Sequence, residues 1–475
     1  MLISTTLPLM CAIIRTEEDR KLHSKLAKKR VSRERILWSQ AKSMHSSRMF
    51  YRLFRMRPES FDKLCWLVEN VVGKKEFKSE AYLDRMLYKY HTTTTTSDLL
   101  YRNSKGFSGD YVSGEWKLAL TLRYLAGATC LDLYLWSNIC PNHIRYLVDD
   151  VLQFWICHPK VLNIDFYSQV FCDDVRRAHI MKNFGDKSDG ILDSCIGALD
   201  GWLVKIICPT YKEVDNPGKY FNRKQFYSLN VQVIVDKSKR VLWRCIGELG
   251  SSHDSQVFHD SKLGKYMENK RDILNEMGCY IIGDSAYALR SYLLCPYDNA
   301  EVDSAEDTFN YFLSSSRIYV ECCFGEVDRR WGVLWRPLEG SLEKKKILVD
   351  ACLRLHNFIL DERDIEDSSE NGAEFSEEEE IELLNEASEE FGLQNPGCFN
   401  SMNFDGQDPT PHDHQQNGIA TEMRNEGKLV RNRLRDELWS KGFRRPSESD
   451  KNKNVVRRDK YNRVVDPDRN SPEIS

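Results

Sequence analysis

The 475-residue sequence predicts an α/β protein built on a mixed sheet, with an all-helical region before the sheet and a disordered tail after it. Two observations support this prediction. Residues 190–360 alternate strand-like and helix-like segments, whereas the preceding stretch shows helical periodicity alone. Beyond residue 360, charged and polar side chains dominate, a composition that is typical of disorder.

The helical region contains the outline of a helix-turn-helix. Between residues 115 and 156, Gly127 ends a first helix, Thr129 caps a short second one and Pro141 begins a third. The third helix offers only His143 and Arg145 near its start as donors to DNA bases. Base reading and a purely structural packing of three helices both remain open.

The α/β region has a recognisable order of elements. A strand ends at Asp200, a period-two strand and its hairpin partner follow, and a second apolar strand ends at Asp284. The expected elements are a strand at 195–199, a hairpin of strands at 226–235 and 240–248, a helix at 254–263, a strand at 279–283, and helices at 288–294 and 307–331.

Charge divides the chain further, although the net charge is only −4. Residues 361–390 carry 15 acidic side chains against one arginine, and residues 428–460 carry 12 basic against 5 acidic ones. An isolated basic amphipathic helix is expected at 428–443. The predicted divisions are a basic N-terminal segment (1–50), a helical region (51–189), the α/β domain (190–360), an acidic disordered linker (361–427) and a basic tail (428–475).

Two further features concern location. Lys28-Lys29-Arg30 could be a nuclear address or a phosphate-binding patch, and a solvated helix face explains it equally well. No apolar run approaches the roughly 18 residues that a membrane span requires, so no membrane association is expected.

Three acidic residues could form a metal site. Asp200 and Asp284 each follow a strand-like run, and Glu321 lies within a long helical pattern. Carboxylate oxygens are the ligands that Mg²⁺ prefers, and two such ions can catalyse displacement at a phosphodiester. Because any α/β domain has carboxylates at strand ends, these residues alone do not distinguish a catalytic site from structural termini.

Six motifs in order place these acids in a known context. They are Gly197-Ala198-Leu199-Asp200-Gly201, Asn222-Arg223-Lys224-Gln225-Phe226-Tyr227-Ser228-Leu229-Asn230-Val231-Gln232, Gly250-Ser251-Ser252-His253-Asp254-Ser255, Gly283-Asp284-Ser285-Ala286-Tyr287-Ala288-Leu289, Glu321-Cys322-Cys323-Phe324-Gly325 and Leu355-His356-Asn357. With these motifs, residues 195–357 resemble the transposase domain of the PIF/Harbinger superfamily, which has an RNase H-like DDE fold.

This resemblance implies a catalytic triad of Asp200, Asp284 and Glu321 that binds Mg²⁺ or Mn²⁺, with Asp254 as a fourth acid that binds metal or orients the site. It implies strand cleavage by water and then attack of the freed 3′-hydroxyl on target DNA. It also implies terminal inverted repeats as the DNA substrate, a homo-oligomer, a separate Myb-like DNA-binding partner and a nuclear location.

Residues near the acids have more than one interpretation. Arg223 and Lys224 could contact backbone phosphate or be charged residues of an exposed turn. His253 could assist proton transfer, although a hydrogen-bonded loop histidine is the more ordinary reading. Tyr287 and the pair His356-Asn357 are expected to pack or cap.

The sequence departs from the family pattern at two positions. Trp202 stands where the family usually has threonine, and Cys322 where a basic residue is common. Neither removes a ligand, but Trp202 could alter the edge of a DNA groove. The prediction is therefore a metal-dependent DDE transposase or endonuclease acting on DNA, and its rival is a domesticated DNA- or chromatin-binding protein that keeps the fold.

Overall fold

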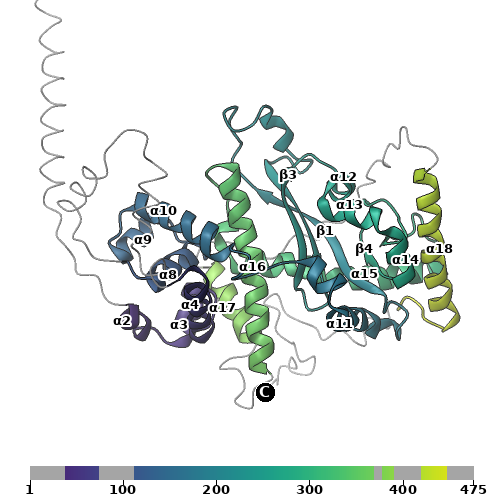
Figure 1. The fold of residues 1–475 in the computed structure, drawn as a ribbon, viewed down its shortest axis with the longest axis horizontal. Helices are drawn as coiled ribbons and strands as arrows, with labels where there is room; N and C mark the ends of the chain where they lie inside the picture. Colours follow the sequence, from purple (N-terminus) through teal and green to yellow (C-terminus); the bar gives the residue numbers. More distant parts are fainter. Residues whose placement is uncertain (1–37, 74–111, 368–376, 390–418, 447–475) are drawn as a thin grey trace, which may run out of the picture.

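The computed structural model describes residues 38–73, 112–367, 377–389 and 419–446, and Figure 1 shows their arrangement. A cluster of helices from the N-terminal part lies at one end, and a sheet covered by helices lies at the other. The long helix α16 (Leu342–Asp367) stands between them. The described helices include none whose length and apolar character would suit a membrane crossing.

The sheet has five strands in the order β3-β2-β1-β4-β5. Strand β1 is antiparallel to β2 and parallel to β4, so the sheet is mixed, as predicted. This order is consistent with the RNase H-like core that the sequence predicts. The strands are β1 (Cys195–Lys205), β2 (Ser228–Val235), β3 (Val241–Leu249), β4 (Tyr280–Ile282) and β5 (Leu293–Leu294).

The hairpin of β2 and β3 is held at its turn by two side chains. Asp236 Oδ1 accepts hydrogen bonds from the backbone N–H groups of Ser238 and Arg240 in the turn, which has Lys239 at φ 67°. At the start of β3, the Asn357 side chain accepts from the N–H and donates to the carbonyl of Val241. The hairpin prediction is confirmed, and Asn357 acts as the packing residue expected.

Helices cover the sheet. Helices α11 and α15 pack on β1, α12 packs on β2 and α16 on β3. The helices of this part are α11 (Asp174–Gly185), α12 (Asp254–Asp260), α13 (Lys262–Asn269), α14 (Arg271–Met277) and α15 (Ala305–Arg330), with the short turns η2 (Tyr167–Phe171), η3 (Asp186–Ser188), η4 (Pro217–Tyr220) and η5 (Gly332–Trp335).

The predicted group of three helices is confirmed. Gly127, at φ 113°, follows the first helix, Thr129 forms a capping box with Asp132, and Pro141 is the first residue of the third helix. Together with preceding helices they form the helical region: α2 (Trp38–Ser43), α3 (Ser47–Phe54), α4 (Pro58–Val72), α8 (Gly114–Leu125), α9 (Cys130–Ser137), α10 (Pro141–Asp150) and η1 (Val151–Ile156).

Two predicted helices of the α/β region are corrected. The segment 288–294 is not helical, because Leu293 and Leu294 pair in parallel with Ile281 and Ile282 of β4. The helix expected at 254–263 is two helices, because the Ser261 side chain accepts from Gly264 N–H and begins α13. Ser261 thus stops α12 and caps the next helix.

The prediction of a disordered linker at 361–427 is wrong where the structure describes it. Helix α16 continues to Asp367, and helix α17 (Glu377–Glu389) docks against α3. Glu380 of α17 is 1% exposed, and its carboxylate is bound by Arg57, Arg363 and Tyr51. Burial of that paired charge and of two leucines on α17 fixes a segment whose composition alone indicates disorder.

The basic helix predicted at 428–443 exists, but it is not isolated. Helix α18 (Ile419–Ser440) begins nine residues earlier and packs on α15 and β5. Gly427 permits this, because a Cβ there would lie 2.8 Å from the carbonyl carbon of Arg290. The segments 1–37, 390–418 and 447–475, including Lys28-Lys29-Arg30, lie outside the described residues.

Candidate active site

Asp200 lies within a strand, so the prediction that a strand ends at this residue is wrong. Strand β1 continues to Lys205, and Asp200 is paired with Val233 of β2. The Asp200 carboxylate folds back along the strand, where its Oδ1 accepts the Gly201 N–H at 2.8 Å. The other oxygen, Oδ2, faces the Arg317 guanidinium.

Asp284 comes two residues after the end of β4 and lies near Asp200. In the parallel pairing of β1 with β4, Ala198 is opposite Ile282, so the residues two positions further along each strand are neighbours. Asp284 Oδ1 accepts the Ala286 N–H at 3.0 Å. Burial, together with the charge of Asp200, raises the pKa of Asp284 to about 6.

Glu321 reaches the same place from helix α15. Its side chain is 57% exposed, and its Oε1 accepts from Arg317 Nη2 at 3.1 Å. The same nitrogen lies 3.0 Å from Asp200 Oδ2, so one guanidinium joins the two acids. Partial burial raises the pKa of Glu321. The structure therefore brings all three predicted catalytic acids together.

Arg317 was missed by sequence reasoning. It lies four residues before Glu321 on α15, the spacing that puts two side chains on the same face of a helix. That spacing is the signal that could have identified it. The charges of Asp200, Asp284 and Glu321 outweigh its burial and raise the pKa of Arg317.

Asp254, at the start of α12, is fixed by amide groups of β2. Its Oδ1 accepts from Asn230 Nδ2 at 2.8 Å and from Gln232 Nε2 at 2.9 Å. The Gln232 carbonyl oxygen in turn accepts the buried Tyr287 hydroxyl at 3.0 Å, which fixes the orientation of the amide. The packing role expected for Tyr287 is confirmed.

Gly201 provides the space for Asp254. A Cβ at Gly201 would lie 2.5 Å from Asp254 Oδ1, so no other residue fits here without moving the carboxylate. Gly201 is paired with Gln232, and successive side chains of a strand point to opposite faces. Asp254 therefore approaches β1 from the face opposite to the one on which Asp200 meets α15.

This geometry distinguishes the four predicted ligands. Asp200, Asp284 and Glu321 converge where α15 crosses β1, whereas Asp254 lies across the strand with one oxygen bound by two amides. Burial, with a contribution from the charge of Asp200, raises the pKa of Asp254. Its role as a metal ligand remains a prediction, and its observed contacts are those of an orienting residue.

The basic pair lies in a tight turn before β2. Asn222 shapes this turn, because its Oδ1 accepts the Lys224 N–H at 2.8 Å and its amide donates to Ser228 Oγ at 2.8 Å. Both Arg223 and Lys224 are exposed. The positive charge of Arg223 also acts to lower the pKa of Asp254, so the turn lies near the acids.

Trp202 does not form a groove edge, which corrects that expectation. It is 3% exposed and stacks on Phe324 of α15 at 5.5 Å between ring centroids. As the second residue after Asp200 it lies on the same face of β1, so it helps to set the distance between β1 and α15. His356 is fully buried and contacts the Lys239 carbonyl, as its expected packing role requires. His253 is an exposed residue before α12, and its proton-transfer role is untested.

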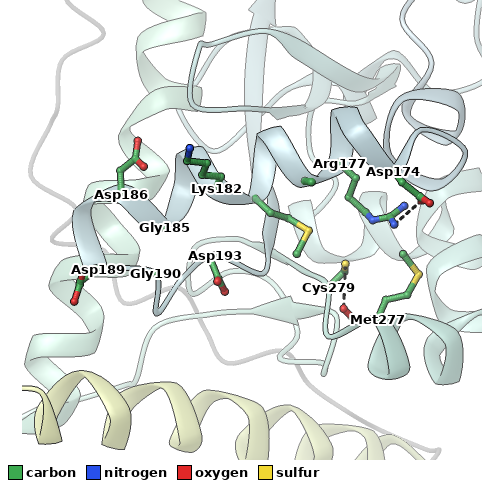
Figure 2. Close-up of a pocket in the computed structure, with 12 residues that line it drawn as sticks. Asp174, Arg177, Lys182, Gly185, Asp186, Asp189, Gly190, Asp193, Met277 and Cys279 are labelled. Atoms are coloured by element: carbon green, nitrogen blue, oxygen red, sulfur yellow. Dashed lines mark hydrogen bonds and ion pairs between the residues drawn. The ribbon is translucent and has the colours of Figure 1, made fainter.

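A pocket of about 690 Å³ lies away from these acids. Asp193 and Cys279, which line it, come just before β1 and β4, so it opens at the beginning of these parallel strands (Figure 2). Arg177 and Asp174 on its α11 wall form an ion pair with each other at 2.6 Å. The pocket is separate from the candidate site.

The donor set fits Mg²⁺ or Mn²⁺. All the converging ligands are carboxylates, which are the oxygen donors that these ions prefer. Burial and then the charge of Asp200 raise the pKa of Asp284, and a cation, Arg317, lies between Asp200 and Glu321. Within the described parts of the chain, no three acidic, histidine or cysteine side chains are gathered closely enough to hold an ion as they stand. Asp200, Asp284 and Glu321 are the residues that would hold it.

The mixed sheet and the converging acids define the class of protein. Residues 199–357 match the family described as DDE superfamily endonuclease, so this part of the chain is similar to the domains of that family. Endonucleases of this superfamily generally use divalent metal ions. The match covers a third of the chain and includes all the candidate acids.

Individual relatives support the predicted resemblance to Harbinger-derived nucleases. The chain is 29% identical over 192 residues to "Putative nuclease HARBI1" of Xenopus laevis, covering 39% of this chain and 51% of the relative. It is 26% identical over 186 residues to "Protein ALP1-like" of Arabidopsis thaliana, covering 36% of this chain and 45% of the relative. It is 31% identical over 173 residues to "Putative nuclease HARBI1" of Mus musculus, covering 35% of this chain and 46% of the relative. The chain thus spans about half the length of these relatives, and no solved structure matches it.

Proposed function

We propose that this protein is a metal-dependent DNA endonuclease with the chemistry of a DDE transposase. The observation that carries the proposal is the convergence of Asp200, Asp284 and Glu321 from β1, the end of β4 and α15. Carboxylates grouped around one site repel one another without a cation, and structural strand termini do not require such a grouping. The match to an endonuclease family supports the same reading.

Each residue has a proposed task. Asp200 and Asp284 are fixed on the sheet by hydrogen bonds to the backbone and would hold divalent ions rigidly, whereas Glu321 is exposed and would complete the ligand set from the helix. When bound, two such ions supply Lewis-acid catalysis at the scissile phosphate. Asp254, bound by Asn230 and Gln232, would position the strand that carries Asp200.

Arg223 and Lys224 would contact the DNA backbone. They are exposed on a rigid turn, and the charge of Arg223 acts on Asp254 beside β1. A phosphate next to a carboxylate site needs nearby cations because the acids repel it. Such contacts position the duplex but carry no sequence information.

The substrate and setting are also part of the proposal. The relatives named as nucleases and the Harbinger resemblance suggest terminal inverted repeats as the DNA, a homo-oligomeric nuclease, a separate Myb-like partner that provides sequence recognition, and action in the nucleus. The third helix of the helix-turn-helix outline, α10, has a single charged donor, Arg145, and two acids at its end, which agrees with recognition by a partner.

The test is Mg²⁺-dependent nicking and joining of DNA that carries the cognate repeats, with the partner supplied. Wild-type protein should nick at the repeat ends, and Asp200→Ala should abolish nicking while DNA binding persists. If the wild-type protein binds this DNA but never cleaves it, the alternative function is favoured, namely a domesticated DNA- or chromatin-binding protein. Cleavage without joining would indicate an endonuclease that has lost transposition.

A further inference from the structure

Arg317 has an unusual position for a basic residue. Its Nη2 atom lies 3.0 Å from Asp200 Oδ2 and 3.1 Å from Glu321 Oε1, and its side chain is only 16% exposed. Asp200 and Glu321 are two of the three acids proposed to hold metal. The guanidinium therefore provides the positive charge at this point of the protein.

The hydrogen bonds from Arg317 to Asp200 and Glu321 are of a kind that another cation can replace. Strong arginine–carboxylate pairs are bidentate, with two parallel hydrogen bonds, whereas here both acids share a single nitrogen. Within the described chain, Arg317 Nε is buried and has no hydrogen-bond partner. Glu321 is more than half exposed, so the outer part of the contact borders solvent. Arg317 is held by charge and not by a complete set of hydrogen bonds.

A divalent ion would need the same oxygens. If it bound Asp200 and Glu321 while Arg317 kept its position, two cationic groups would lie within a few ångströms of each other in a partly buried site. The long arginine side chain borders the half-exposed Glu321 and can rotate away, whereas the acids of β1 and β4 are fixed by backbone hydrogen bonds.

We propose that Arg317 is an internal counter-ion which holds Asp200 and Glu321 in the metal-free protein and has to leave them when divalent metal binds. It is a positioning residue, and it sets the metal affinity. Without metal, it limits the repulsion among the acids and keeps α15 close to β1. This inference rests on the proposed metal-dependent function.

The test measures metal binding and does not use catalysis. Isothermal titration of the full chain with Mn²⁺ compares the wild type with Arg317→Gln, Arg317→Lys and the control Lys212→Gln, which removes an exposed charge. Arg317→Gln should bind Mn²⁺ about fivefold or more tightly, because one competing charge is gone. Arg317→Lys, which keeps the charge, and the control should remain near the wild type.

Thermal unfolding provides an independent readout. In EDTA, Arg317→Gln should have a lower Tm than the wild type, because the acids repel one another. Saturating Mn²⁺ should remove this difference. Equal or weaker Mn²⁺ binding by Arg317→Gln overturns the inference, whereas failure of the wild type to bind Mn²⁺ or Mg²⁺ at all overturns the proposed function as well.

If Arg317→Gln does not fold, the wild-type protein alone still tests whether metal displaces Arg317. Guanidinium NMR signals of selectively labelled arginine, with Arg317 assigned by its loss in Arg317→Lys, should shift when Mg²⁺ is added. A guanidinium signal that stays unchanged at saturating Mg²⁺ contradicts the displacement.

Discussion

Single residues determine the shape of the candidate site for steric reasons. Gly201 lies between two acids and leaves room for Asp254, which Asn230 and Gln232 then hold. The sequence suggests that the strand ends at Asp200, yet the backbone continues as a strand through Gly201. Its lack of a side chain is needed for the close approach of a carboxylate and not for backbone freedom.

Replacing Gly201 by alanine should therefore displace Asp254. The new methyl group would overlap the carboxylate, and loss of its two amide hydrogen bonds should reduce the free energy of unfolding by about 1–3 kcal/mol. Chemical denaturation measures this change. A double-mutant cycle with Asp254→Ala is the control, because without the carboxylate the methyl group should cost much less. Additive effects of the two substitutions would contradict the explanation.

The acids themselves could be predicted from sequence, whereas their counter-ion was identified only in the structure. Asp200, Asp284 and Glu321 occur in motifs that follow one another in a recognisable order, and the structure places them around Arg317. Arg317 can be assigned to the site only when Glu321 is known to lie beside Asp200. Trp202 was expected at the surface because the sequence does not show that Phe324 would cover it.

At the scale of elements, composition is misleading where a few buried contacts decide the structure. Helix α17 comes from an acidic stretch, but Glu380 is enclosed by Arg57, Arg363 and Tyr51. These partners lie far away in the sequence or in other helices, so no local pattern reveals them. Helix α18 is similar, because its docking depends on Gly427 meeting the loop after β4.

Substitution of Glu380 by glutamine should release α17. Two arginines would be left buried without their carboxylate, and breaking a buried pair in this way costs about 3–5 kcal/mol. Hydrogen exchange of residues 377–389 should increase accordingly. Glu382→Gln is the matched control, since Glu382 is an exposed residue of the same helix and should leave exchange unchanged. Equal protection in both variants would show that α17 docks by its leucines alone.

At the scale of the molecule, the helical region and the sheet domain share one core. Arg330 at the end of α15 donates to the Tyr51 hydroxyl and to the Arg55 carbonyl, and both groups belong to the helical region. His356 of α16 lies in the same interior and contacts the Lys239 carbonyl and Cys323. The fold class was predictable from the alternation of strands and helices, but this fusion of the two regions was not.

The buried His356 predicts how the stability of the whole molecule depends on pH. Burial lowers the pKa of His356 to about 4. The unfolded chain, with an ordinary histidine pKa near 6.5, therefore binds a proton that the folded state excludes. This contribution is present above about pH 6.5 and is lost as the pH falls toward 4, by about 3 kcal/mol.

Urea denaturation of wild type and His356→Gln between pH 7 and pH 4 measures this effect. Glutamine can still donate to the Lys239 carbonyl but does not titrate, so its free energy of unfolding should fall less steeply over this interval. His259→Gln, at an exposed position, should follow the wild type. Parallel curves for wild type and His356→Gln would rule out His356 as the source of this pH dependence.

The central claim is that Asp200, Asp284 and Glu321 form one metal-dependent site for phosphodiester cleavage. The most direct measurement is the single-turnover rate of DNA nicking in Mg²⁺ by wild type, Asp284→Asn and the control Asp272→Asn, whose acid is exposed on α14. The account predicts that Asp284→Asn loses at least about a hundredfold in rate, while the control and the wild type cleave equally. Undiminished nicking by Asp284→Asn would contradict it.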